Sequence, residues 1–173
     1  AFVVESAVQS RHRCWKSSDG LTVMAAHQHR KNACARGPAD VPDRRFVRAQ
    51  HQRDRSGDWT TIEAPLDLPA ALAGARPDEV VLIDCATLWL TNHLLANHDL
   101  VLETKRLLTS LAACPAPVVI VSNETGWGIV PENALARRFR DEQGRLNQRL
   151  AHQADLVVTV IAGLPLVLKG QLP

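Results

Sequence analysis

The sequence contains no long apolar run and no tyrosine, although 46% of its 173 residues are hydrophobic. A membrane-spanning helix needs about 20 consecutive apolar residues, and no segment reaches that length. The brief apolar opening AFVVESAV gives no clear secretory signal. We therefore expect a cytoplasmic protein, and its length suits one domain with a hydrophobic core of its own.

Closely spaced cysteines are also absent. The four cysteines, Cys14, Cys34, Cys85 and Cys114, lie far apart and form no CxxC pair. This spacing favours reduced thiols in a cytosolic protein over a disulfide framework or a zinc site.

Charge is divided unevenly along the chain, although the net charge is only +2. Residues 1–56 carry 11 Lys and Arg against 5 Asp and Glu, whereas residues 57–173 carry 9 against 13. A basic arm can bind nucleic acid. Its arginines, however, are scattered among His, Gln, Ala and Pro, with no helical stripe and no interleaved aromatic residues. A nucleic-acid-binding protein is therefore a remote alternative.

Three short apolar runs dominate the rest of the chain, at residues 80–83, 118–121 and 156–161. Continuous apolar runs of this length, separated by helical patterns, are typical of strands buried on both faces of a parallel sheet. The sequence therefore predicts an α/β fold with a mostly parallel sheet flanked by helices.

The segments between these runs fit helices, which we expect over residues 66–74, 88–96, 100–113 and 131–151. Within 100–113 the leucines recur at a spacing of three to four, which indicates an amphipathic helix. Residues 167–168 are expected to form a last edge strand.

The beginning of the chain has a different texture. Residues 2–4 could form a first strand, but no period of 2 or 3.6 follows for about 40 residues. The composition of residues 27–45 is typical of a loop or of disorder. We therefore divide the chain into an atypical basic segment, 1–46, and an α/β domain of nucleotide-binding type, 47–173.

Polar side chains end two of the expected strands. Asp84 ends the run VVLID, and Asn123 and Glu124 follow the next run. Ligands of open parallel sheets bind at the carboxyl ends of the strands, and nucleotide-hydrolysing P-loop proteins hold Mg²⁺ with an acid at such a position. Asp84 is therefore a candidate Mg²⁺ ligand. The alternatives are that Asp84 caps the following helix and that Asn123 and Glu124 form a plain turn.

A histidine among arginines is a second candidate. His51 is flanked by Arg48, Arg53 and Arg55, and guanidinium groups match phosphate oxygens. A neutral imidazole beside them can attack phosphorus and form a covalent intermediate. Glu63 follows soon after and could contact a base or a ribose. Taken singly, His51 and Glu63 are equally compatible with ordinary surface residues.

The last expected helix is rich in arginine at positions 137, 138, 140, 145 and 149. Such a face is usually solvated and forms ion pairs with nearby acids, here Asp141 and Glu142. The alternative is that Arg137 and Arg140, three residues apart, face a phosphate or a neighbouring subunit.

The segment SNETGWGIVPENALARRFRDEQGRLNQRLA, residues 122–151, closely resembles the bifunctional adenosylcobinamide kinase / adenosylcobinamide-phosphate guanylyltransferase family of cobalamin biosynthesis. The resemblance covers about residues 47–170. It extends through AQHQRDR, WTTIEAPLDL, VVLIDCATLWLTN and ADLVVTVIAG.

The resemblance implies a P-loop-type α/β fold and a homo-oligomer, typically a trimer. It implies phosphorylation of the aminopropanol hydroxyl of adenosylcobinamide by ATP or GTP with Mg²⁺. GMP then passes from GTP to adenosylcobinamide phosphate through a guanylylated histidine.

The resemblance also assigns roles to individual residues. The guanylylated histidine falls on His51, and Asn123, Glu124 and Arg137 are expected to shape the cleft or a subunit contact. The nucleotide-contacting residues fall on Gln52, Arg53, Asp54, Arg55, Glu63 and Asp84.

The family opens with a phosphate-binding Walker A loop of the form GGxRSGKS, and this chain contains no such loop. Lys16-Ser17-Ser18 is the nearest echo, without the glycines. Two explanations remain open: a shifted reading frame over about the first 45 residues, or true divergence. Without the loop we expect very slow turnover, so a catalytically impaired binding or scaffold subunit is the alternative function.

Overall fold

The computed structural model describes residues 5–10, 21–26 and 59–172. The strands are β1 (Glu5–Ser10), β2 (Leu21–Ala26), β3 (Trp59–Glu63), β4 (Glu79–Asp84), β5 (Val118–Asn123), β6 (Leu156–Ile161) and β7 (Leu164–Lys169). The helices are α2 (Leu68–Ala73), α3 (Ala86–Leu95), α4 (Leu100–Ala113) and α5 (Ala134–Gln153).

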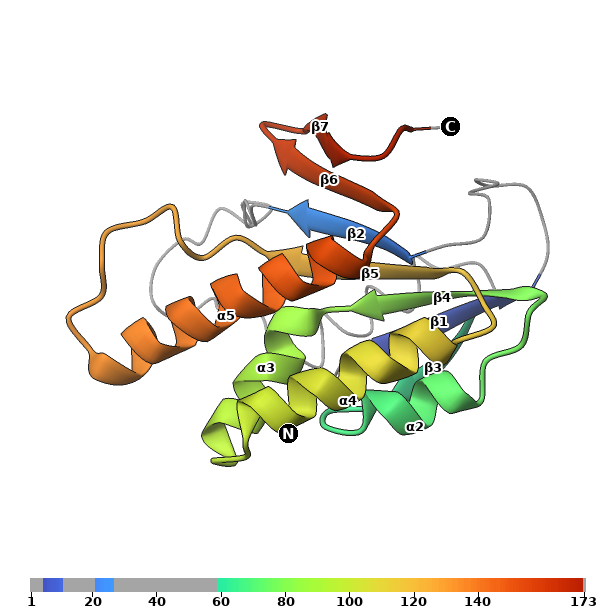
Figure 1. Cartoon of the computed structure of the whole chain (residues 1–173), viewed down its shortest axis with the longest axis horizontal. Coiled ribbons are helices and arrows are strands. Elements are labelled where there is room, and N and C mark those ends of the chain that lie inside the picture. Colours follow the sequence, from blue (N-terminus) through green and yellow to red (C-terminus); the bar gives the residue numbers. More distant parts are fainter. Residues whose placement is uncertain (1–4, 11–20, 27–58, 173) are drawn as a thin grey trace, which may run out of the picture.

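The described strands form one sheet in the order β3-β1-β4-β5-β2-β6-β7, and the described helices lie together in front of it in Figure 1. Strands β4, β5, β2 and β6 pair in parallel, whereas β1 and β7 run antiparallel to every strand they pair with. Because β1 lies between β3 and β4, β3 points the same way as the parallel strands. The expected α/β fold with a mostly parallel sheet is therefore confirmed, and five strands end at one edge.

Two strands come from the beginning of the chain, where the sequence showed no periodicity. Strand β2 lies at the interior of the sheet between β5 and β6, and β1 lies between β3 and β4. Each is bonded on both sides, so tertiary pairing rather than local propensity determines these strands. The expected strand at 2–4 and the expected loop at 27–45 lie outside the described residues.

The expected helices are all present, and polar side chains cap the beginnings of three of them. Asp67 caps α2, Asp99 caps α4 and Asn133 caps α5. The side-chain oxygen of Asn133 accepts hydrogen bonds from the backbone amides of Leu135 and Ala136 at 2.8 and 3.2 Å. These bonds satisfy amides that have no partner inside the helix, so α5 begins just after Asn133, three residues later than the expected range of 131–151.

The core lies between the sheet and the helices. In β5 the side chains of Val118, Ile120 and Ser122 are buried and their alternating neighbours are half-buried, so burial on both faces is incomplete there. In β6, residues 156–159 are all buried, as expected for a strand covered on both faces. Trp89 of α3 is the largest side chain among the most deeply buried residues.

None of the described helices combines the length and apolar character that crossing a membrane would require.

Candidate functional site

Three sequence-predicted polar positions end strands at the same edge of the sheet. Glu63 ends β3, Asp84 ends β4 and Asn123 ends β5. Glu63 and Asp84 are both register partners of Glu5, one from each side of β1. Registered partners point to the same face, and two strand spacings separate their backbones by about 10 Å. The exposed residues Glu63 and Asp84 therefore lie on one face of the sheet at its carboxyl edge.

The segment that follows Glu63 is fixed to α3 by three side chains. The indole Nε1 of Trp89 donates to the carbonyl oxygen of Leu66 at 3.0 Å, and Asn92 Nδ2 donates to that of Pro65 at 2.8 Å. His93 Nε2 lies 3.1 Å from the same Leu66 oxygen. Because α3 begins just after β4, these bonds hold the ends of β3 and β4 in a fixed relation.

The hydrogen bonds of His93 define its protonation. A carbonyl oxygen can only accept, so Nε2 carries the proton shared with Leu66. In the neutral ring Nδ1 then accepts from His98 Nδ1 at 2.9 Å. Burial lowers the pKa of His93, and the Leu66 carbonyl opposes this shift. His93 is therefore a neutral structural histidine rather than a proton-transfer group at neutral pH.

Helix α3 begins at Ala86, and Cys85 occupies its N-cap position without a side-chain capping bond. The N-cap position considered for Asp84 is therefore occupied by its neighbour, Cys85. Burial raises the pKa of the Cys85 thiol, and the charge of Asp84 raises it further. Cys85 is therefore a protonated thiol at neutral pH and a poor nucleophile.

Asn123 connects the ends of β4 and β5. The hydroxyl oxygen of Thr87, in the first turn of α3, accepts from the backbone amide of Asn123 at 3.0 Å and from its Nδ2 at 3.1 Å. Thr87 is buried. This pair fixes the end of β5 against the beginning of α3, so the polar residues after β5 form more than a plain turn.

A second set of bonds joins β5 to α5. The hydroxyl of Ser122 donates to Asn147 Oδ1 at 2.6 Å, and Gln143 Nε2 donates to both Ser122 Oγ and Asn147 Oδ1 at 2.9 and 2.8 Å. Asn147 Nδ2 in turn donates to Glu124 Oε1 at 2.8 Å and to the Asn123 carbonyl at 3.1 Å. The position of the Glu124 carboxylate is therefore set by α5.

The sequence interpretation missed Thr87 as an Asn123 partner, and it missed Ser122, Gln143 and Asn147 entirely. A signal was present in α5, where Gln143 and Asn147 are four residues apart and flank the buried Leu146. Polar side chains on the apolar stripe of a helix need buried partners, and this pattern could have found two of them.

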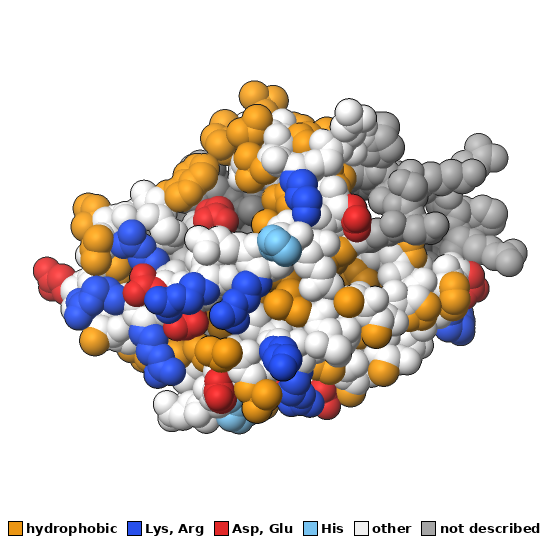
Figure 2. Space-filling view, viewed as in Figure 1, with side chains coloured by type: hydrophobic (Ala, Val, Ile, Leu, Met, Phe, Trp, Pro, Cys, Tyr) orange, Lys and Arg blue, Asp and Glu red, His pale blue; other side chains and the backbone are white. Residues whose placement is uncertain are grey.

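Arg137 forms its hydrogen bonds with the loop before α5 and not with the edge of the sheet. Its guanidinium Nη1 donates to the carbonyl oxygens of Pro131 and Glu132 at 3.0 and 2.5 Å. Arg145 forms an exposed ion pair with Glu142 at 2.6 Å. Arg137 thus holds the loop that leads into α5. Figure 2 shows Lys and Arg side chains gathered over α5.

The remaining predicted site residues lie outside the described residues: His51, Gln52, Arg53, Asp54 and Arg55. Their roles remain predictions. In the part of the chain that the structure describes, no group of three or more His, Cys, Asp or Glu side chains could hold a metal ion by itself.

Comparison with known proteins gives the same family as the resemblance of the sequence motifs. A sequence profile of the family described as cobinamide kinase / cobinamide phosphate guanyltransferase, CobU, matches residues 9–168. The match begins well before residue 47, where the resemblance was expected to begin, although the sequence there still lacks a Walker A loop.

Curated relatives agree with this match. The bifunctional adenosylcobalamin biosynthesis protein CobP of Pseudomonas aeruginosa is 44% identical over 126 residues, 71% of this chain and 73% of the relative. The proteins CobU of Salmonella typhimurium and of Escherichia coli are 39% and 37% identical over 146 residues, 75% of this chain and 81% of each relative. The chain belongs to the cobinamide kinase / cobinamide phosphate guanyltransferase family.

Proposed function

We propose that this chain phosphorylates the aminopropanol hydroxyl of adenosylcobinamide and then transfers GMP from GTP to the new phosphate. The observation that carries the proposal is the family match over residues 9–168. The common edge at which β3, β4 and β5 end supports it, because ligands of parallel sheets bind there.

In the guanylyl step, the neutral imidazole of His51 attacks the α-phosphorus of GTP. An N–P bond forms, the bond to the β-phosphate oxygen breaks and pyrophosphate leaves. A phosphate oxygen of adenosylcobinamide phosphate then attacks the same phosphorus. The N–P bond breaks, GMP passes to the substrate and the imidazole is regenerated.

The residues next to His51 serve the nucleotide. Arg53 and Arg55 neutralise phosphate charge, and Gln52 and Asp54 complete the contacts. Glu63 accepts hydrogen bonds from the base or the ribose. Its position at the carboxyl edge, in register with Glu5, supports this role.

Asp84 would hold Mg²⁺ beside the nucleotide phosphates. Mg²⁺ keeps several waters and needs only one or two protein carboxylates beside substrate oxygens. The exposed carboxylate of Asp84 at the end of β4 fits that demand without a cage of protein ligands. When bound, Mg²⁺ neutralises charge on the phosphates.

Guanylylation of the protein tests the proposal. Incubation with labelled GTP should give an acid-labile, base-stable adduct, as expected for a phosphorus–nitrogen bond. The variant His51→Ala should remove the adduct, and His152→Ala, at an exposed histidine of α5, should retain it. Equal labelling of His51→Ala would reject the role of His51.

The missing Walker A loop predicts slow labelling by the chain as written. Removal of a single preorganised donor to a developing charge costs a factor of about 10²–10³ in rate. A version carrying the sequence GGxRSGKS after β2, which ends at the carboxyl edge of the sheet, should therefore label at least that much faster. Equal rates would show that this chain does not depend on a phosphate loop.

We also propose a homotrimer and a cytoplasmic location. Three leucines of β7, Leu164, Leu166 and Leu168, are 71%, 52% and 62% exposed, and apolar side chains cover this hairpin in Figure 2. Such a surface is typical of protein contacts. Among the described cysteines, Cys85 and Cys114 are free thiols, as expected in the cytoplasm. Sedimentation equilibrium tests the trimer, and a monomeric mass at micromolar concentration would reject it.

A further inference from the structure

A hollow of about 390 Å³ lies between the loop after β5 and one face of α5. We name it the carboxyl-end hollow. Glu124 and Thr125 line it from the loop, and Arg140, Gly144 and Gln148 line it from the helix. Residues four apart share a helix face, so these three α5 positions form one continuous wall.

The helix wall of the hollow carries polar side chains that have no partner among the described residues. Arg140, Asp141 and Gln148 line the hollow. Among the described residues, none of these three side chains has an ion pair or a hydrogen bond. By contrast, Arg145, which also lines the hollow, is paired with Glu142. The wall therefore offers hydrogen-bond donors and acceptors to a ligand.

The loop wall adds two more groups. Glu124 gives its Oε1 atom to Asn147, which fixes the carboxylate and leaves Oε2 as an acceptor. The hydroxyl oxygen of Thr125 is buried and has no partner among the described residues. Buried polar atoms without partners are rare in folded proteins, so this hydroxyl also points to a ligand.

Gly144 keeps the hollow open. A glycine inside a helix costs about 1 kcal/mol relative to alanine. A Cβ atom at Gly144 would meet no atom within 4 Å, so packing does not require the glycine. The empty space in front of it suits a group that the described residues do not supply.

The lining charges favour a neutral polar ligand over an anion. Two arginines, Arg140 and Arg145, and two carboxylates, Glu124 and Asp141, line the hollow. Arg145 is already paired with Glu142, so the remaining lining charges do not favour a phosphate. A primary carboxamide matches the mixture, because its oxygen accepts from Arg140 and its nitrogen donates to the acids. Further along the same loop, Ile129 is 97% exposed and offers an apolar surface.

We propose that the carboxyl-end hollow binds the primary carboxamide side chains of the corrinoid substrate, with the apolar part of the loop against its macrocycle. Cobinamide carries several such amides around an apolar ring. The inference rests on the proposed function, because that function supplies the corrinoid. It assigns to this face the part of the substrate remote from the phosphate.

Filling the hollow tests the proposal. Binding of cobinamide to the full chain is measured by equilibrium dialysis, with the corrinoid absorbance as the readout. Gly144→Leu should melt at the same temperature as the unchanged protein or above it, because leucine favours helix and a Cβ atom at this position meets no atom within 4 Å. It should bind cobinamide at least about tenfold more weakly, since a lost charged hydrogen bond and blocked contacts exceed about 1.4 kcal/mol.

Gly144→Ala is the matched control and should bind within about twofold of the unchanged protein, because a methyl group leaves most of the hollow open. If Gly144→Leu binds cobinamide as well as Gly144→Ala does, the hollow is not the site. If the unchanged protein binds no cobinamide, the inference is also overturned.

A second pair of variants isolates the guanidinium. Arg140→Gln should weaken cobinamide binding about tenfold, whereas Arg138→Gln, an exposed position of α5 outside the hollow, should leave it unchanged. Equal effects of the two changes would indicate general charge rather than a contact in the hollow, and would overturn the inference.

The ligand itself tests the amide chemistry. A corrinoid whose side-chain amides are hydrolysed to carboxylates should bind more weakly than cobinamide. Equal or tighter binding of the carboxylate form would overturn amide recognition. GTP labelling of His51 separates this inference from the proposed function: loss of labelling with retained, Gly144-sensitive cobinamide binding rejects the function and leaves the hollow as a corrinoid site.

Discussion

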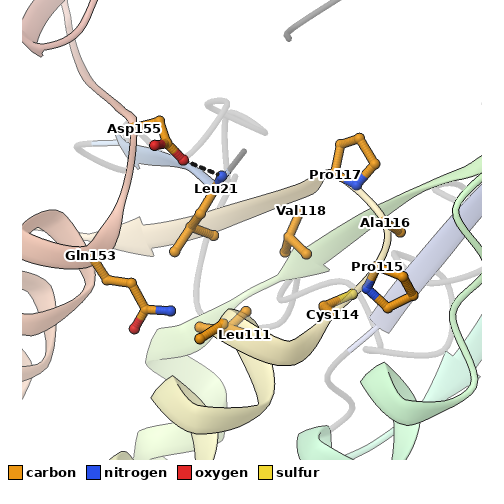
Figure 3. Close-up of a pocket in the computed structure, with 10 residues that line it drawn as sticks. Leu21, Leu111, Cys114, Pro115, Ala116, Pro117, Val118, Gln153 and Asp155 are labelled. Carbon is orange, nitrogen blue, oxygen red and sulfur yellow. Dashed lines mark hydrogen bonds between the residues drawn. The ribbon is translucent and has the colours of Figure 1, made fainter. Parts of the chain in front are cut away.

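The two ends of the sheet each carry a hollow of nearly the same volume, but the two hollows differ in their polar groups. The amino-end hollow, about 380 Å³, lies where β2 and β5 begin (Figure 3). Two of its polar side chains are already bonded: Asp155 accepts from the backbone amide of Leu21 at 2.8 Å, and Gln153 donates to the carbonyl of Leu108 at 3.1 Å.

The carboxyl-end hollow has the opposite character. Its Arg140, Asp141 and Gln148 side chains have no partner in the described ranges. Volume alone therefore does not identify a binding site. Polar groups without protein partners distinguish the carboxyl-end hollow, because a ligand can bond to them without breaking bonds inside the protein. The amino end should respond to mutation in stability and the carboxyl end in binding.

The largest expected effect is on stability at the amino end. Leu111 lines that hollow and is 5% exposed. Leu111→Ala should lower the free energy of unfolding by about 2–4 kcal/mol through lost burial and an enlarged cavity. Urea unfolding measures this loss. The affinity for cobinamide, measured below the unfolding range, should not change, and a parallel loss of affinity would break the contrast between the ends.

The second prediction concerns Asn147, which connects stability and binding at the carboxyl end. Asn147→Ala removes the partner of Glu124 and leaves Ser122 and Gln143 with fewer bonds inside the protein. We expect a loss of about 1–3 kcal/mol in unfolding free energy and weaker cobinamide binding as well. Urea unfolding and equilibrium dialysis measure the two effects. Unchanged affinity despite lower stability would show that Glu124 does not need Asn147 to serve the hollow.

The sequence predicted the elements that local pattern determines. The helices from Leu68 onward and the strands β4, β5 and β6 were found because continuous apolar runs and helical spacing indicate them directly. Strands β1, β2 and β3 were not found. Their places in the sheet depend on partners far away in the chain, such as Val118 of β5 for Leu21 of β2, and no local period records such pairing.

The site was predictable in part for a similar reason. Asp84 and Asn123 were identified because polar residues that end apolar runs must meet at one edge of a parallel sheet. Glu63 was identified from its place after His51 and from the family resemblance. The bonds that position them were not predictable. Thr87 and Asn147 act through contacts across 36 and 23 residues of chain, with Asn123 and Glu124 respectively. Sequence spacing alone does not specify such contacts.

The third prediction returns to the amino end. The carboxylate of Asp155 accepts from the amide of Leu21, and the Asp155 amide donates to the Leu21 carbonyl at 2.8 Å. Asp155→Ala removes the first bond and keeps the second. It should cost about 1 kcal/mol in unfolding free energy, with cobinamide affinity unchanged. Hydrogen exchange at the Leu21 amide should become faster, and an unchanged rate there would show that the side-chain bond does not protect it.

The smallest expected effect is a pH dependence from His93, at the carboxyl end. Burial lowers its folded pKa below the ordinary value of 6.5. As the pH falls through 6.5, the unfolded chain binds a proton that the folded protein refuses, so stability present above that pH is progressively lost toward the folded pKa. His93→Gln, which retains a donor for Leu66, should reduce this loss. Urea unfolding between pH 7 and pH 5 measures the free energy of unfolding of the unchanged protein and of His93→Gln. The difference between these two free energies should become smaller as the pH falls. Parallel curves would mean that His93 does not cause the pH dependence of stability. The hydrogen bonds from α3 to the segment after Glu63 would then not depend on the protonation of His93.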